Sequence, residues 1–389
     1  MALRAHVSEL QAPRPGPDPE VDLSGPIPPR PLTSLLDDAA AAFADRPCLD
    51  FLGRRYRYRE VATLADRAAK GLQELGVGVG TRVGLFLPNT PYFIVLHYAV
   101  LKAGGVVVNF NPLLAEREIE QQIADSGVEI MATLDLCALY GKLARVLERR
   151  PVPHVVICRM RDILTMAKRH LFAVMRRKEV AQVPSDDRHV PFERLIANDG
   201  RFTPVLCDPA KTVAVLQYTG GTTGTPKGAE LTHANLYVNA VQSRRWYHDR
   251  ALGAERILAV LPLFHIFGMT TVMNVGLLIG AELILLPRFE IRQLLQVIHR
   301  RRPTVFAAVP TLFAAVIRYE QRRRYDLSSL EICTSGGAPL PSDTKQQFEE
   351  LTGCVIVEGY GLTEASPVVC CNPVRSLQKT GSVGLPYPL

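Results

Sequence analysis

Short apolar runs alternate with helical patterns along this chain of 389 residues, and this alternation restricts the possible folds more than any other feature. In the first part of the chain, the runs expected to form strands are residues 82–87, 106–110, 128–134 and 154–158. Helical patterns lie between them at residues 91–103, 116–126 and 137–149. Strands that alternate with helices at this spacing predict right-handed crossovers and a parallel sheet covered on both faces.

The second part of the chain repeats this alternation. Strands are expected at residues 212–217, 257–261, 282–286, 304–308, 330–334 and 354–358, and helices at 234–246, 269–279, 291–301, 311–321 and 342–351. The sequence therefore predicts an α/β fold of two doubly wound, mostly parallel-sheet subdomains with helices on both faces. We expect a proline-rich arm over 1–31, a first subdomain over 32–204 and a second over 205–389, with ligands bound in a cleft between the two.

The stretch from Tyr218 to Lys227 reads YTGGTTGTPK and follows the apolar run at 212–217. Its glycines allow the backbone to curl, its threonines supply hydroxyl donors, and Lys227 adds a positive charge, which together suit a phosphate-binding loop. The expected contacts are Thr219, Gly220, Gly221, Thr222, Thr223, Gly224 and Thr225. Lys227 follows a proline and precedes a glycine, unlike the lysine of an ordinary P-loop. The alternative is a flexible surface linker.

Three further motifs accompany this loop: LPLFHIFG at 261–268, SGGAPLP at 335–341 and GYGLTE at 359–364. Together they make the chain, from about residue 32 to its end, resemble the adenylate-forming enzymes, most closely the long-chain fatty acyl-CoA ligases. The resemblance implies an ATP-dependent acid–CoA ligase that converts a fatty acid to acyl-AMP and then to acyl-CoA, with ATP, Mg²⁺ and coenzyme A. A carboxylate that attacks the α-phosphorus is already an anion, so this step requires charge neutralisation and alignment rather than a protein nucleophile.

The resemblance also assigns roles to individual residues. Lys227 and the Gly/Thr loop would hold the leaving pyrophosphate, Thr363 would donate to the α-phosphate, and Glu364 would be the magnesium ligand. The adenine would stack on Tyr360, between Gly359 and Gly361, and would be bordered by Gly336, Gly337, Ala338 and Pro339. His265 would position the reacting carboxylate, although a lone histidine in an apolar run is also typical of a protein core.

The substrate class is inferred from a missing charge, because the stretch 261–275 contains no carboxylate that could hold an amino group. This absence favours an apolar acid. The residues expected to line its channel, each equally at home in a core, are Met269, Val272, Met273, Gly276, Val309 and Leu312. Three other readings stay open: a ligase for aryl or dicarboxylic acids, a non-catalytic lipid or membrane-surface module, and an ordinary P-loop nucleotidase.

Residues 159–178 interrupt the alternation with a basic amphipathic pattern. Seven Lys or Arg residues accompany the single acidic Asp162, so this segment carries +6 of the chain's net charge of +7. The expected apolar face consists of Ile163, Leu164, Ala167, Leu171, Val174 and Met175. Such a helix suits an anionic membrane surface, and an insertion packed on the subdomain is an equal alternative.

The remaining expectations concern the setting of the protein. Eight irregularly spaced cysteines and an N-terminus without an apolar core segment predict a cytoplasmic protein with reduced thiols, and a peripheral position on the inner face of a membrane stays open. Residues 266–286 are long enough to cross a bilayer, but Gly276 and Gly280 favour a helix followed by a strand. We expect no nucleic-acid partner and leave a homodimer open. The sequence stops after GSVGLPYPL, where relatives continue into a lid domain, so impaired adenylation is expected.

Overall fold

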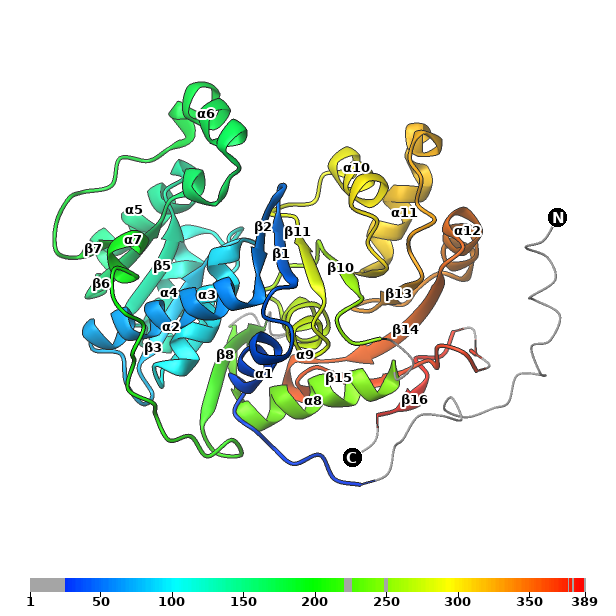
Figure 1. The fold of residues 1–389 in the computed structure, drawn as a ribbon, viewed down its shortest axis with the longest axis horizontal. Helices are drawn as coiled ribbons and strands as arrows, with labels where there is room; N and C mark the ends of the chain where they lie inside the picture. Colours follow the sequence, from blue (N-terminus) through cyan, green and yellow to red (C-terminus); the bar gives the residue numbers. More distant parts are fainter. Residues whose placement is uncertain (1–24, 220–225, 248–250, 377, 380, 388–389) are drawn as a thin grey trace.

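The computed structural model describes residues 25–219, 226–247, 251–376, 378–379 and 381–387, and it confirms the predicted α/β fold. Two sheets, mostly parallel, are flanked by helices (Figure 1). Within the described residues, every strand and helix predicted from the alternating pattern occurs, with bounds that differ from the prediction by at most three residues, whereas the amphipathic pattern at 159–178 forms a shorter helix. The predicted helices at 137–149 and 269–279 each begin as a π-helix, Cys137–Gly141 (η1) and Gly268–Asn274 (η4), and continue as an α-helix.

The first sheet has seven strands in the order β7-β6-β5-β3-β4-β8-β9. Its members are β3 (Arg82–Phe86), β4 (Val106–Asn109), β5 (Ile130–Leu134), β6 (His154–Cys158), β7 (His189–Pro191), β8 (Val213–Thr219) and β9 (Lys227–Thr232). All neighbours in this sheet are parallel except β8 and β9, which form an antiparallel pair. The helices associated with it are α2 (Tyr58–Glu74), α3 (Pro91–Lys102), α4 (Glu116–Ser126), α5 (Lys142–Arg149) and α7 (Phe192–Leu195).

The second sheet has nine strands in the order β16-β15-β14-β13-β12-β10-β11-β1-β2. They are β1 (Pro47–Phe51), β2 (Arg54–Arg57), β10 (Arg256–Ala259), β11 (Glu282–Leu285), β12 (Val305–Ala308), β13 (Ile332–Ser335), β14 (Val355–Gly361), β15 (Val368–Cys371) and β16 (Leu385–Pro386). Its helices are α1 (Ser34–Ala42), α8 (His233–Trp246), α9 (Val275–Leu278), α10 (Ile291–Arg301), α11 (Pro310–Arg318) and α12 (Ser342–Thr352). The strands from β14 to β1 provide the parallel part of this sheet and β2, β15 and β16 its antiparallel edges.

The two sheets do not separate at residue 204, where the sequence suggested a boundary. The hairpin β1–β2 is early in the chain but joins the second sheet through parallel pairing of β1 with β11. Strands β8 and β9 follow residue 204 but join the first sheet, where β8 pairs with β4. One pair of strands from the first part of the sequence, β1 and β2, thus belongs to the second sheet, and one pair from the second part, β8 and β9, belongs to the first sheet.

The predicted strand, loop and helix around residues 212–246 contain one strand that the sequence did not predict. Between the loop and α8, β9 runs antiparallel to β8, with Thr219 opposite Lys227. Thr232 then caps α8 as expected, because its Oγ1 accepts a hydrogen bond from the Asn235 amide at 3.1 Å. The predicted loop therefore connects two antiparallel strands rather than a strand and a helix.

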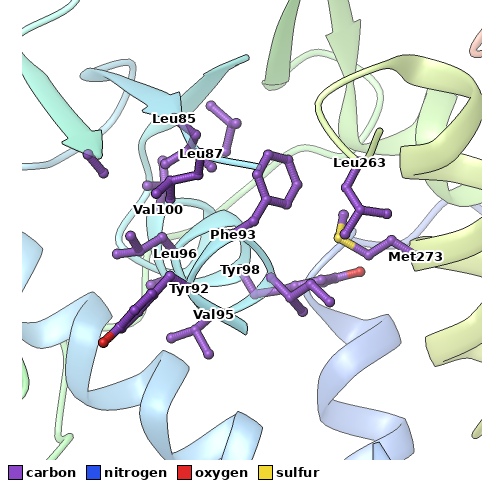
Figure 2. Close-up of a cluster of buried hydrophobic side chains, with 14 of the residues drawn as sticks. Leu85, Leu87, Tyr92, Phe93, Val95, Leu96, Tyr98, Val100, Leu263 and Met273 are labelled. Atoms are coloured by element: carbon purple, nitrogen blue, oxygen red, sulfur yellow. The ribbon is translucent and has the colours of Figure 1, made fainter. Parts of the chain in front are cut away.

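The main hydrophobic core surrounds α3, in which all twelve residues are buried. Figure 2 shows part of this core, where Phe93 lies toward Leu263 and Tyr98 toward Met273, while Leu96 points to the other side of the helix. A helix that is apolar on every side must be covered on every side, and α3 packs both on its own sheet and toward the helical turns after β10. The core is consequently continuous between the two sheets.

The segment 159–178 forms the 3₁₀ turn Met160–Ile163, helix α6 (Met166–Met175) and the start of the 3₁₀ turn Arg177–Glu179. The single apolar face expected from the sequence is divided in two. Ile163 and Leu164 are buried in the main core, whereas α6 has no buried residue. In the described part of the chain, no helix combines the length and apolar character needed to span a bilayer, and residues 266–286 form a short helical segment followed by β11.

Candidate functional site

A cavity of about 300 Å³ lies where the second sheet meets α8 and the helical turn after β10. Its lining includes seven of the residues predicted to act at the site, and these come from three segments that are far apart in the sequence. They are His265, Gly336, Gly337, Gly359, Tyr360, Gly361 and Thr363. The carboxyl ends of the parallel strands β13 and β14 bring the last six together, because adjacent parallel strands end at the same edge of a sheet.

The two glycine-containing turns at this edge pack closely against their surroundings. A Cβ atom on Gly336 would lie 3.0 Å from Cζ of Phe267, and one on Gly361 would lie 2.2 Å from the Pro367 carbonyl oxygen. The turn after β13 is also tied to β14, since Oε1 of Glu358 accepts a hydrogen bond from the Leu340 amide at 2.9 Å. These contacts fix the position of Tyr360, whose side chain is 51% exposed.

His265 lies on the wall of the cavity with one ring nitrogen already engaged. Its Nδ1 accepts a long hydrogen bond from the Phe267 amide at 3.3 Å, which favours the tautomer that carries its proton on Nε2. Desolvation by surrounding atoms lowers the pKa of His265, so the neutral ring is favoured. A neutral imidazole in this tautomer can donate a hydrogen bond from Nε2 to an anionic oxygen in the cavity.

The stretch predicted to bind phosphate is described only at its two ends. Thr219 ends β8 and is half-buried, and Lys227 begins β9 with an exposed side chain. Gly220, Gly221, Thr222, Thr223, Gly224 and Thr225 lie outside the described residues. Cα atoms of β9 come within 8 Å of those of the 3₁₀ turn Thr363–Ala365 (η6), so the strand of Lys227 and the turn of Glu364 are neighbours.

The remaining predicted residues lie beside the cavity. Glu364 is exposed in η6, next to Thr363, which does line the cavity. Ala338 and Pro339 are exposed directly after Gly337 and are not among the described lining residues. The described residues hold no group of three His, Cys, Asp or Glu side chains arranged to bind a metal. Mg²⁺ commonly binds through one or two carboxylates and substrate phosphates, and the single exposed carboxylate of Glu364 suits that mode.

Away from the glycine turns, most of the cavity wall is apolar. Its main apolar residues are Ile257, Val275, Ile279, Val305, Ala307 and Ile332. The wall extends as far as Glu255, which precedes β10 and is buried, with its Oε2 2.5 Å from the Thr304 hydroxyl. Because Glu255 is at the amino end of the sheet and Gly336 and Gly359 are at the carboxyl end, the cavity runs along the strands.

The residues of the helical segment after β10 that the sequence offered for an acyl channel do not line this cavity. Met269, Val272 and Met273 are completely buried in the core, and a Cβ on Gly276 would meet Cδ2 of Leu283 at 2.5 Å. The residues of this segment that line the cavity are Thr271, Val275 and Ile279, spaced at four-residue intervals. Val309 and Leu312 are also absent from the described lining. The i, i+4, i+8 spacing was available in the sequence, but the apolar character of both faces concealed it.

The sequence also gave no indication of the contribution of α8. Ser243, Arg244 and Tyr247, at and just after its carboxyl end, all line the cavity. Trp246, the only tryptophan of the chain, is buried beside Tyr387, another lining residue, with ring centroids 5.1 Å apart. The Trp246 indole donates a hydrogen bond to the Asn372 carbonyl at 2.9 Å, which fixes its orientation.

Comparisons with known proteins identify the family of the chain. The chain is 38% identical over 375 residues to a long-chain-fatty-acid–CoA ligase of Bacillus subtilis, covering 93% of this chain and 65% of that relative's length. The fold is shared with an anthranilate CoA ligase solved with anthranoyl-AMP (TM-score 0.79, 22% identity, 93% of this chain and 65% of that one). It is also shared with a long-chain-fatty-acid-CoA ligase from Archaeoglobus fulgidus (TM-score 0.78, 24% identity, 94% and 70%). Residues 36–389 match the family described as AMP-binding enzyme, and the chain belongs to that family.

Proposed function

We propose that this protein uses ATP and Mg²⁺ to activate a fatty acid as acyl-AMP, from which coenzyme A takes the acyl group. The observation that carries the proposal is a single cavity that joins the two glycine turns, Thr363 and His265 to an elongated apolar wall. A nucleotide needs the first part and a hydrocarbon chain the second. The name of the Bacillus subtilis relative supports the same substrate class.

The nucleotide would bind at the carboxyl edge of the second sheet. The exposed ring of Tyr360 offers a stacking surface for adenine, and the turn of Gly336 and Gly337, which also lines the cavity, would border the base. Thr363 can donate a hydrogen bond to the α-phosphate, and Lys227, on the neighbouring strand, can neutralise the pyrophosphate. When Mg²⁺ is bound it would supply further charge neutralisation, and Glu364 is the described residue suited to hold it.

The fatty acid would place its carboxylate near His265. One carboxylate oxygen forms a bond to the α-phosphorus, the bond to pyrophosphate breaks, and pyrophosphate leaves with the electron pair. The Nε2 proton of His265 would orient the carboxylate and would not be transferred. In the second step the thiol sulfur of coenzyme A attacks the acyl carbon, the thiol gives up its proton, and AMP leaves.

The hydrocarbon chain would lie along the apolar wall formed by Val275, Ala307 and Ile332. Each methylene removed from water stabilises the complex by about 0.8 kcal/mol, so affinity should rise with chain length until the cavity is filled. The buried carboxylate of Glu255 marks the polar end of the wall, where a methyl terminus gains nothing by advancing further.

Incubation with ATP, magnesium and a mixture of octanoate, palmitate, benzoate, anthranilate and pimelate, followed by mass spectrometry of the retained ligand, tests the proposal. A fatty acyl adenylate is the expected product, and an aryl or dicarboxyl adenylate would assign the substrate to another class. Calorimetric titration with ATP and magnesium provides the second measurement. Lys227→Ala and Glu364→Gln should weaken ATP binding, whereas Lys211→Ala, a change at an exposed lysine before β8, should not. Equal ATP affinity in the unmodified protein and in all three variants would contradict the proposal.

A further inference from the structure

Helix α6 presents an apolar surface that no part of the described chain covers. We define its outer face as two adjacent rows of exposed residues. The first row is Met166, His170 and Val174, and the second is Ala167, Leu171 and Met175. The exposed fractions of the four large apolar side chains are 68% for Met166, 58% for Leu171, 82% for Val174 and 70% for Met175. Residues spaced by four along a helix lie on one face, so these side chains form one continuous strip.

The opposite side of α6 attaches the helix to the rest of the protein. Phe172 is half-buried against the main core, and Arg169 forms an ion pair with Asp162 at 3.3 Å. The Lys168 ammonium donates a hydrogen bond to the Leu52 carbonyl at 2.7 Å. These contacts fix the orientation of the helix, so the outer face is held away from the protein in a constant direction. Figure 1 shows α6 at the outer edge of the molecule, beyond α5.

The segments before and after α6 are anchored as well. Ile163 and Leu164, which precede the helix, are buried. After it, the Ala181 amide donates a hydrogen bond to the Asp135 carbonyl at 2.8 Å, and Val180 pairs with Leu136. A helix secured at both ends and on its inner side loses little conformational entropy when its outer face binds a partner.

Basic side chains surround the outer face. Arg161, Arg169 and Arg176 are paired with Asp162 or Glu179. Among the described residues, no acidic side chain pairs with Arg159, Lys168, Arg177 or Lys178. The surface therefore combines an apolar strip with an excess of positive charge at its edge and at the carboxyl end of the helix.

We propose that the outer face of α6 docks on the surface of a bilayer that contains anionic phospholipids. The apolar side chains would enter the boundary between headgroups and acyl chains, while Arg177 and Lys178, at the carboxyl end of the helix, would contact the phosphates. Charge decides between this partner and a second copy of the chain. Two copies joined through this face would bring their basic residues together, whereas an anionic surface neutralises them. The proposal is independent of the proposed function, because α6 contributes nothing to the lining of the cavity.

Flotation of the protein with vesicles of phosphatidylcholine, with or without 30% phosphatidylglycerol, tests the proposal. We expect binding to the anionic vesicles, weakened by salt, and little binding to the neutral ones. The variant Leu171→Ser/Val174→Ser/Met175→Ser should bind anionic vesicles about tenfold more weakly or worse, as should Arg177→Glu/Lys178→Glu. All five side chains are exposed, so both variants should unfold at the same temperature as the unmodified protein.

Matched controls separate this surface from general properties of the protein. Val79→Ser/Leu113→Ser removes two other exposed apolar side chains, and Arg323→Glu/Arg324→Glu reverses two other exposed arginines. Both controls should bind the vesicles like the unmodified protein. Absence of binding to anionic vesicles would overturn the proposal, as would equal loss in the control variants. A concentration-dependent dimer that the triple serine variant abolishes, without vesicle binding, would assign the face to a second copy instead.

Discussion

The hydroxyl of Tyr247 lies 2.9 Å from Oγ1 of Thr334, a hydrogen bond that ties the end of α8 to strand β13 across the cavity. Both residues line the cavity, and burial raises the pKa of Tyr247 well above its ordinary value, so the phenol stays protonated. The bond keeps α8 at a fixed distance from the sheet and thereby sets the width of the space between them.

Removing this bond is expected to loosen the cavity without changing its chemistry. Tyr247→Phe should lower the free energy of unfolding by about 0.5–1.5 kcal/mol, because Thr334 loses a partner in a partly buried place. Denaturation by urea measures this change. Thr334→Val should have a similar effect, and the double variant should cost clearly less than the sum of the two single changes. Additive effects would mean that the two hydroxyls do not interact.

Narrowing the apolar wall should shorten the preferred fatty acid. Ala307→Leu places three more carbon atoms at a buried position in the cavity wall, so long chains should lose more affinity than short ones. Trp246, buried beside Tyr387, provides a fluorescence signal for titration with octanoate and palmitate. Ala124→Leu, a matched change at an exposed position of α4, should leave both affinities unchanged. Equal losses of affinity for octanoate and palmitate would mean that the hydrocarbon chain does not lie along this wall.

His265 should act as a neutral hydrogen-bond donor. His265→Ala is expected to lower the rate of adenylate formation by about 100-fold with little change in ATP affinity, because the donor contacts only the acid. His265→Gln, which retains a side-chain N–H donor, should recover part of the rate. Since desolvation lowers its pKa below the ordinary value of 6.5, the ring is mostly neutral at pH 7, and the rate should not rise as the pH falls from 8 to 6.5. A rate that rises as the pH falls over this range would show that the protonated ring is required.

Two buried histidines should make the protein sensitive to acid. Burial lowers the pKa of His97 to about 3 and that of His233 to about 4, against an ordinary value of 6.5. Between pH 4 and 6.5 the unfolded chain binds protons that the folded chain does not, so stability falls as the pH falls. The loss approaches about 1.4 kcal/mol per pH unit for each histidine.

The effect of pH can be assigned to His97 by substitution. Neither of its ring nitrogens has a hydrogen-bond partner among the described residues, so His97→Leu removes no bond and should reduce the dependence on pH. Urea unfolding at pH 7.5 and pH 5 measures the difference in the free energy of unfolding. An unchanged difference in the variant would contradict the contribution assigned to His97.

The close packing of the GYG turn should make its second glycine intolerant of a side chain. Gly361→Ala would bring a Cβ to 2.2 Å from the Pro367 carbonyl oxygen, and a backbone atom cannot move aside cheaply. We expect a loss of about 1–3 kcal/mol in the free energy of unfolding and weaker ATP binding, measured by urea denaturation and calorimetry. Gly78→Ala, which meets no atom within 4 Å, should behave like the unmodified protein.

The sequence predicted those features that local patterns determine. The alternating strands and helices were located to within three residues, and the turns containing Gly336 and Tyr360 were placed correctly at the ends of β13 and β14. Parallel strands make this inference possible, because every loop after a strand of one sheet lies at the same edge. A motif that directly follows a parallel strand in the sequence is therefore expected at the carboxyl edge of the sheet in the folded protein.

The features that the sequence missed depend on long-range pairing or on which of two apolar faces is covered. Strand β1 joins the second sheet because it pairs with β11, and nothing near residue 50 indicates that partner. On the segment after β10, Met273 and Val275 are equally apolar, yet one lies in the core and the other faces the cavity. In the segment 159–178, Leu164 is buried while Leu171 is exposed, although both belong to the same predicted face.

The pairing of β1 with β11 also has a consequence for synthesis on the ribosome. Strand β11 begins roughly 230 residues after β1 ends. At the usual rate of translation, the first hairpin leaves the exit tunnel about 10–50 s before its partner exists. The newborn polypeptide therefore carries this hairpin without its parallel partner throughout that interval, and the second sheet can close around β1 only after β11 has been made.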